Sequence, residues 1–461
     1  MKALYVSVAV GVAVGLLYAL SPLTVWFALA MIALLRWAGR GLPETERRWI
    51  QWLLLAGIAA RVTVIAGLFL LTDHTRVPFG SFFGDEEYFI KRAMWLRNVA
   101  LGTSIHRADL IYAFDDYSYT SYLYVLAFLQ VLVGPAPYGL HLFGAAVYLA
   151  GAVLLFRLVR PSLGPITAFG GLALTLFLPS LFAWSISALK EPLYLAIGAG
   201  AMVATVNAVR QPRWPARIGM TVVVVAATLV LQTIREGGFA IAAASITGGL
   251  ILAALSLRPR MAWTLVLIAP FVVAFAWRVP EVQVAAWRGV RQVAKVHWGH
   301  IQTVGYTYKV LDDRLYRDRS SIDAMDRGEV LRYLVRASVS YVTVPLPWQI
   351  ESRAALGYVP EQMIWILMIA LAPLGVASGT RRDPLVTWLL VSFGIAAAVP
   401  VALTSGNVGT LVRHRGLAVP FLVWLSAGGA AELAARLGRR SRWIDSAALA
   451  PSSAKVEPIC P

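Results

Sequence analysis

Long apolar runs separated by short polar turns dominate this chain. Runs long enough to cross about 30 Å of hydrocarbon begin near residues 4, 22, 49, 139, 163, 190, 217, 238, 261, 361, 385 and 415. Only a helix satisfies its own backbone hydrogen bonds over such lengths in lipid. The pattern predicts an all-α polytopic membrane protein with about twelve transmembrane helices.

Arginines gather in short turns between these runs, and their side of the membrane sets the topology. The groups are Arg36, Arg40, Arg47 and Arg48; Arg157 and Arg160; Arg210, Arg213 and Arg217; Arg258 and Arg260; Arg381 and Arg382; and Arg436, Arg439, Arg440 and Arg442. The positive-inside rule places them all in the cytoplasm. This alternation holds only if the apolar stretch from Tyr119 to Val133 does not cross, so we expect a juxtamembrane or re-entrant helix there.

The topology divides the chain into three parts. An N-terminal transmembrane hairpin and cytoplasmic turn cover 1–48, a membrane domain covers 49–435, and a basic cytoplasmic tail covers 436–461. Met1 and Lys2 also fit a signal peptide, but a second apolar run follows after barely a turn, which favours a retained hairpin. We therefore expect an integral protein of the plasma (inner) membrane with both termini in the cytoplasm. The outer face receives the loops 72–138 and 278–360 and most of the unusual polar residues.

Composition narrows the function classes. The chain has 461 residues, 59% hydrophobic and 14% charged, with a net charge of +17. Much of that excess lies in the orientation turns, so a nucleic-acid partner is not expected. The single cysteine, Cys460, allows neither an intrachain disulfide nor a thiolate metal cluster.

An acidic cluster, Asp85-Glu86-Glu87-Tyr88, opens the first outer loop. Carboxylates beside a bilayer indicate chemistry at the membrane face. If residues 85–98 are helical, Asp85, Tyr88 and Arg92 share one face as an acid/base strip. Asp85, with Glu86 beside it, is our catalytic candidate. Acids in a first turn also favour the helix dipole, and this structural interpretation suits Glu86 and Glu87.

Cations mark three other points on the outer face. They are Lys190, followed by Glu191; Arg235, followed by Glu236; and Arg413-His414-Arg415 before the last span. Guanidinium and ammonium groups bind lipid phosphates well. The structural alternatives are that Glu191 compensates Lys190, that Arg235 pairs with Glu236, and that the last group contacts headgroups.

The long late loop carries two further patterns. His297 and His300 have a spacing that suits two metal ligands, but no third ligand is fixed, so no metal site is predicted and a structural or stacking role is favoured. The run from Arg332 to Trp348 mixes arginines with aromatic residues, which is typical of a helix lying at the membrane interface.

Together these motifs resemble the GT-C superfamily of integral-membrane glycosyltransferases, most nearly the bacterial family-39-like branch with its protein mannosyltransferase and aminoarabinose transferase relatives. That family has an acidic motif with a downstream Tyr in its first outer loop, juxtamembrane helices, a second outer turn similar to Lys190-Glu191-Pro192, and an Arg-x-Arg followed by Pro, as in Arg413-His414-Arg415 and Pro420. The resemblance spans roughly Trp49 to Ala434. The N-terminal hairpin and the Lys190-Glu191 pair depart from the usual pattern.

The resemblance implies transfer of a sugar from a polyprenyl-phosphate donor to a glycan, lipid or protein acceptor at the outer face. Asp85 would act as general base. Tyr88, Arg92, Lys190, Glu191, Arg235, Arg413, His414 and Arg415 would bind the sugar or lipid phosphate. The sequence assigns no cofactor, and it leaves open whether a divalent cation is needed.

Two alternatives remain at this point. A polysaccharide polymerase or O-antigen ligase would use His297, His300 and the loop arginines. A transporter of lipid-linked sugars would need interrupted helices and charges at mid-membrane. Apart from Arg61, which we expect to reach the interface, the charges lie at the ends of the apolar runs.

Overall fold

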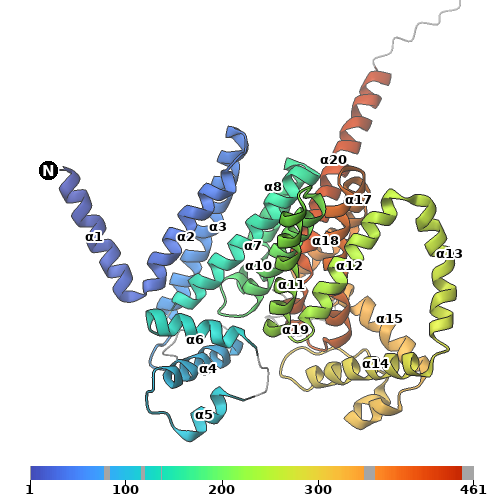
Figure 1. Cartoon of the computed structure of the whole chain (residues 1–461), viewed down its shortest axis with the longest axis horizontal. Helices are drawn as coiled ribbons and strands as arrows, with labels where there is room; N and C mark the ends of the chain where they lie inside the picture. Colours follow the sequence, from blue (N-terminus) through green and yellow to red (C-terminus); the bar gives the residue numbers. More distant parts are fainter. Residues whose placement is uncertain (1, 77–83, 116–119, 136–137, 347–358, 449–461) are drawn as a thin grey trace, which may run out of the picture.

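The computed structural model describes residues 2–76, 84–115, 120–135, 138–346 and 359–448 (Figure 1). No strand of a sheet occurs in these residues, and an isolated antiparallel bridge joins Thr307 to Asn407. The helices are α1 (Lys2–Leu20), α2 (Pro22–Gly39), α3 (Glu44–Leu71), α4 (Gly84–Ala100), α5 (Arg107–Ala113), α6 (Tyr122–Val133), α7 (Gly139–Leu163), α8 (Pro165–Phe177), α9 (Pro179–Ser185), α10 (Glu191–Arg210), α11 (Trp214–Ile234), α12 (Gly238–Leu257), α13 (Pro259–Ala276), α14 (Pro280–Ile301), η1 (Asp313–Tyr316), η2 (Arg319–Ala324), α15 (Arg327–Thr343), α17 (Val359–Arg382), α18 (Pro384–Thr404), α19 (Val408–Arg415) and α20 (Val419–Ala448).

Many of these helices are built to cross a membrane. Within the described residues, nine are long and apolar enough, or up to eleven if each of two bent pairs counts as one span. The bent pairs are α8 with α9, at 64°, and α19 with α20, at 67°. Every apolar run predicted from the sequence lies in a helix. The prediction of an all-helical, multi-pass membrane protein is confirmed, and the number of crossings depends on how the bent pairs and α1 are counted.

The stretch expected not to cross forms the short helix α6. Its 12 residues reach roughly 18 Å at 1.5 Å per residue, well short of the hydrocarbon thickness. It packs against α4 through Leu123, Leu126 and Ala127. In Figure 1 α4, α5 and α6 lie across one end of the bundle of long helices. Residues 116–119 and 136–137, at either side of this helix, lie outside the described residues.

Close backbone contact holds the bundle together where small residues face each other. The pair α17 and α20 and the pair α12 and α18 pack most extensively. A Cβ on Gly375 of α17 would overlap the carbonyl oxygen of Leu425 in α20. Glycine is therefore needed at this contact, where the backbones of the two helices approach closely. Small residues at such contacts are typical of helix packing in membranes.

The basic turns gather at one end of the bundle. Arg160 donates two hydrogen bonds of 2.9 Å to Glu46, and Arg210 pairs with Asp383. Arg382 donates to the carbonyl of Leu163 at 2.6 Å. Turns that the sequence assigned to one side of the membrane therefore contact one another.

The opposite end carries two further layers of helices, with the short helix α19 between them. In Figure 1 α4–α6 lie on one side of α19, and α14 and α15 lie on the other. The second layer has its own small core, which includes Ala294, Leu315 and Tyr333. A capping box between Asp326 and Glu329 starts α15. Most of the predicted interfacial run is therefore helical, while its last residues, Pro347 and Trp348, lie outside the described part of the chain.

Arg61 of α3 does not reach the interface as we expected, because its side chain is fully buried. It donates to the hydroxyl of Ser185 (2.8 Å) and to the carbonyl of Leu176 (3.0 Å). The chain bends between α8 and α9, and the N–H of Ser180 bonds Glu361 instead of the Leu176 carbonyl. Arg61 therefore satisfies a carbonyl that the bend leaves without its helical donor.

Candidate functional site

Asp85 and Glu86 are neighbours in the first turn of α4, yet they face different surroundings. Consecutive helical residues point about 100° apart. The Asp85 side chain is 65% exposed, whereas Glu86 is completely buried. Glu86 accepts a hydrogen bond from the N–H of Ala188 (2.8 Å) and bonds Nε2 of His141 (3.1 Å). Glu86 thus fastens α4 to α7 and to the segment before α10, and it leaves Asp85 at the surface.

The turn before α10 is set by close packing. The chain leaves the helical conformation after Ser185 and re-enters it at Glu191, with Pro192 in the first turn, a position that suits proline. A Cβ on Gly144 of α7 would lie 2.7 Å from the carbonyl oxygen of Ser187. Only glycine lets α7 approach this turn so closely. The turn places Lys190 and Glu191 beside α4 and α19.

Arg413 joins three elements of the fold. Its helix, α19, is capped by the side chain of Asn407, which accepts from the N–H of Gly409 at 2.9 Å. The guanidinium donates to Asp85 of α4, and both Nε and Nη2 lie 3.1 Å from Oε1 of Glu191 in α10. It also lies over the ring of Trp184, 5.3 Å from its centroid. The anions opposite Arg413 are therefore two carboxylates of the protein itself.

Two more cations lie beside this pairing. Nη1 of Arg235, at the end of α11, is 3.9 Å from Oε1 of Glu191; Glu236, which we considered as its partner, is exposed. The Lys190 ammonium lies 5.8 Å from the ring centroid of Phe89 and makes no hydrogen bond or ion pair within the described residues. Burial, together with Arg235 and Arg413, lowers the pKa of Lys190 to about 8, although Glu191 opposes this shift.

These residues, Asp85, Lys190, Glu191, Arg235 and Arg413, are referred to below as the Asp85–Arg413 cluster. It holds three cations and two carboxylates, so it carries one excess positive charge when all five are ionised. Oε2 of Glu191 is buried and has no hydrogen-bond partner in the described part of the chain. An added anion would improve the charge balance, and it would raise the lowered pKa of Lys190.

Arg92 and Tyr88 belong to the support of the cluster. The phenol of Tyr88 accepts from Arg92 at 2.5 Å. Arg92 is buried and donates to the carbonyl of Ala113, the last residue of α5, and to that of Asp115 just after it. The predicted strip is only partly formed, because Arg92 turns toward α5 while Asp85 turns toward Arg413. Arg92 therefore holds α4 and α5 together.

Arg415 also lies apart from the cluster, although it follows Arg413 by two residues. It is buried, donates to Oε1 of Gln362 (2.8 Å) and to the carbonyl of Val344 (2.6 Å), and lies 4.9 Å from the Trp365 ring centroid. These contacts fasten α19 to α15 and α17. Arg413 alone of the two arginines faces the cluster.

The two histidines of α14, His297 and His300, have different surroundings. His297 is buried between the carbonyl of Ser405 (2.6 Å) and the hydroxyl of Tyr316 (3.0 Å), and burial lowers its pKa to about 4. It is a neutral structural link. His300 bonds the carbonyl of Thr404 (2.7 Å), and its ring lies 6.5 Å from that of His414. In the described residues, no group of three or more His, Cys, Asp or Glu side chains is placed to hold a metal ion.

Sequence reasoning missed three residues at this site: His141, Trp184 and Tyr122. His141 is a titratable side chain inside a long apolar run, a signal that could have drawn attention to it. Tyr122 of α6 is buried, its hydroxyl lacks a hydrogen-bond partner in the described residues, and the nearby carboxylates of Glu86 and Glu191 add to the rise in its pKa that burial causes. Nothing in the local pattern of Trp184 or Tyr122 distinguishes them from packing residues.

Comparison of the chain with protein-family models, with curated proteins and with solved structures found no match.

Proposed function

We propose that the chain is a membrane glycosyltransferase that moves a sugar from a polyprenyl-phosphate donor to an acceptor hydroxyl at the outer face. The observation that supports this most is a gathering of five charged residues at one end of the bundle. Asp85, Glu191 and Arg413 come from three separate helices, Lys190 comes from the turn before α10, and Arg235 directly follows α11. A donor of this kind has a phosphate at the membrane surface and a prenyl chain in lipid. A cationic cluster at the end of apolar helices suits both parts.

Each charged group has a distinct task in this proposal. The exposed carboxylate of Asp85 accepts the proton of the acceptor hydroxyl while that oxygen bonds to the anomeric carbon. The bond between the anomeric carbon and the phosphate oxygen breaks, and the prenyl phosphate leaves with the bonding electrons. Lys190, Arg235 and Arg413 stabilise the charge of the leaving phosphate.

Arg413 can serve both Asp85 and the phosphate. A guanidinium has five N–H donors, and three of its contacts here go to Asp85 and Glu191. Donors remain for a phosphate oxygen while the ion pair with Asp85 persists.

The test is sugar transfer by detergent-purified protein supplied with labelled polyprenyl-phosphate sugars. We expect Asp85→Asn to lose about 100-fold or more of the turnover, the size of a general-base contribution. Glu87→Gln is the matched control, because Glu87 lies in the same turn and pairs only with Lys91 of α4 among the described residues. Full turnover in Asp85→Asn would refute the proposed role of Asp85.

The same assay addresses the polymerase or ligase alternative. That alternative relies on His297 and His300, but His297 is buried and bonded on both ring nitrogens. If His300→Ala loses turnover and Asp85→Asn keeps full turnover, the polymerase or ligase alternative is favoured over our proposal.

A transporter of lipid-linked sugars is a second proposal, and the two bent helix pairs favour it. Interrupted helices around a central site are typical of secondary transporters. Here α9 and α19 meet through Trp184 and Arg413. Turnover of the donor in detergent, without sealed vesicles, would exclude transport as the sole function.

A further inference from the structure

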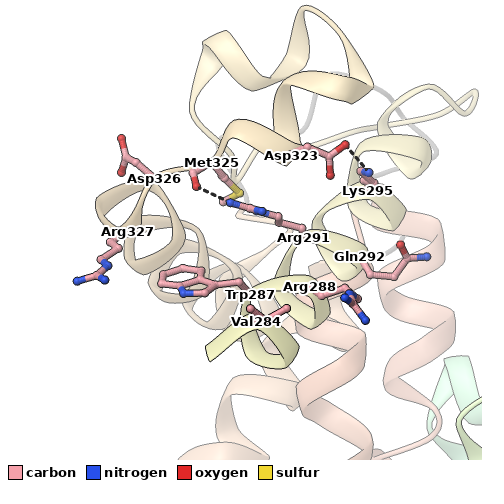
Figure 2. Close-up of a pocket in the computed structure, with 10 residues that line it drawn as sticks. All are labelled: Val284, Trp287, Arg288, Arg291, Gln292, Lys295, Asp323, Met325, Asp326 and Arg327. Carbon is pink, nitrogen blue, oxygen red and sulfur yellow. Dashed lines mark hydrogen bonds and ion pairs between the residues drawn. The ribbon is translucent and has the colours of Figure 1, made fainter. Parts of the chain in front are cut away.

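A hollow outside the Asp85–Arg413 cluster lies between α14 and the segment from η2 to the start of α15. Its volume is about 670 Å³, large enough for a small ligand. Figure 2 shows its lining: Trp287, Arg288, Arg291, Gln292 and Lys295 come from α14, and Asp323 and Met325 face them. The hollow belongs to the layer of α14 and α15, which also contains His300. This layer lies at the end of the bundle where the Asp85–Arg413 cluster lies.

The acidic groups of the hollow already have partners, whereas its three arginines, Arg288, Arg291 and Arg327, form no ion pair within the described residues. Lys295 pairs with Asp323 at 2.8 Å, and Asp326 caps α15. Arg291 extends across the hollow toward Met325 and reaches its carbonyl only at 3.4 Å (Figure 2). The buried Nε of Arg291 has no hydrogen-bond partner within the described residues, and Arg288 is exposed. The lining of the hollow therefore carries positive charge that no carboxylate of the described residues neutralises, and an anion would balance it.

The chemistry of the lining suits an acidic sugar better than a simple anion. A guanidinium binds a carboxylate or phosphate through paired N–H donors. Trp287 lies beside Arg291 and offers an apolar ring, and the amide of Gln292 can both donate and accept. An aromatic ring together with a few directed polar groups is the composition of a site that orients a ligand.

The direction of α14 links this hollow to the cluster. From Arg288 to His300 the helix runs roughly 18 Å at 1.5 Å per residue, and the His300 ring lies beside that of His414, next to Arg413. A short oligosaccharide lying along α14 would reach from the hollow to the reacting end of the site.

We propose that this hollow binds an acidic residue of the acceptor glycan, a sugar that carries a carboxylate or a phosphate. That the bound glycan is the acceptor rests on the proposed glycosyltransferase function. Binding of an acidic sugar in the hollow does not require turnover and can be tested by itself. Arg291 is the main anion partner, Arg288 adds charge, and Trp287 contacts the sugar ring.

The experiment measures binding of two oligosaccharides to the full chain in detergent by titration calorimetry. The acidic probe is a tetramer of galacturonic acid, and the neutral probe is maltotetraose. We expect the acidic probe to bind at least about ten-fold more tightly. Arg291→Gln and Trp287→Ala should each weaken its binding by about ten-fold or more. Arg317→Gln is the control, because Arg317 is an exposed arginine of the same layer that does not line the hollow.

Equal binding of the two probes, or binding that Arg291→Gln leaves unchanged, would overturn the inference. Binding of phosphatidylglycerol vesicles that Arg291→Gln weakens, without binding of the acidic probe, would overturn it as well. Including Asp85→Asn separates the two proposals: if it binds the acidic probe normally and retains full turnover, the subsite stands and the general-base role fails.

Discussion

Arg413 of α19 and Asp85 of α4 form an ion pair across 328 positions of the chain. The arginine side chain is only 14% exposed, whereas that of the aspartate is 65% exposed. The cation is therefore part of the packed wall, and the carboxylate projects to the side that a substrate would approach. Glu191 holds the other edge of the guanidinium, so the direction of the Asp85 carboxylate depends on both α19 and α10.

Arg413→Lys tests whether the geometry of this pair matters beyond its charge. A lysine keeps the charge but cannot contact Asp85 and Glu191 through separate N–H groups. We expect the turnover of donor to fall by about ten-fold or more, while the protein still folds. Arg317→Lys, measured in the same assay, controls for loss of a guanidinium elsewhere in the chain. Wild-type turnover in Arg413→Lys would mean that charge alone is required.

The lowered pKa of Lys190 leads us to expect a loss of activity at alkaline pH. Its pKa in the free protein is about 8, so a rise in pH through this value removes the positive charge and weakens binding of the donor phosphate. The profile of kcat/KM, which reports the free enzyme, should fall above about pH 8. The bound phosphate raises the pKa of Lys190, so the fall in kcat should come at higher pH.

Lys190→Arg is the matched variant for this prediction. An arginine stays protonated throughout this range, so the alkaline fall in kcat/KM should move to higher pH. An unchanged alkaline limb in Lys190→Arg would assign the titration to another group.

Substitution of Glu86 should have a different effect from substitution of its neighbour Asp85. Glu86→Ala removes the buried acceptor of the Ala188 N–H and the partner of His141. A buried donor left without a partner costs about 1–3 kcal/mol, so the thermal midpoint should fall together with turnover. Glu86→Gln keeps an acceptor for the Ala188 N–H and should recover part of both. A midpoint in Glu86→Ala equal to that of the wild type would contradict the structural role.

Arg415 should affect stability rather than chemistry. Arg415→Gln leaves the carbonyls of Tyr341 and Val344 without their donor and removes the contact with Trp365. We expect the thermal midpoint to fall more than in Arg413→Lys, and turnover per folded molecule to fall less. Thermal unfolding and turnover measured on both variants check this contrast, and the reverse order would exchange the roles of the two arginines.

The sequence alone determined the helical elements of this protein, because of the lengths of its apolar runs. A backbone in lipid must satisfy its hydrogen bonds within the segment, so each apolar run had to become a helix. The stretch around α6 was expected not to cross because of the positions of the arginine turns, and α6 is indeed too short. A helix over residues 85–98 was considered only as a condition for the acid/base strip, and α4 forms there from Gly84 to Ala100.

Only the tertiary structure decided which charged side chains meet. Asp85 and Glu86 are adjacent and chemically alike, and Arg413 and Arg415 are two residues apart, yet one member of each pair faces the cluster and the other is buried in packing. The outcome depends on the rotation of α4 and α19 about their axes. That rotation is fixed by contacts with α7, α10, α15 and α17, from distant parts of the chain. Local sequence determines which side chains a helix carries, and packing between helices determines the direction in which those side chains point.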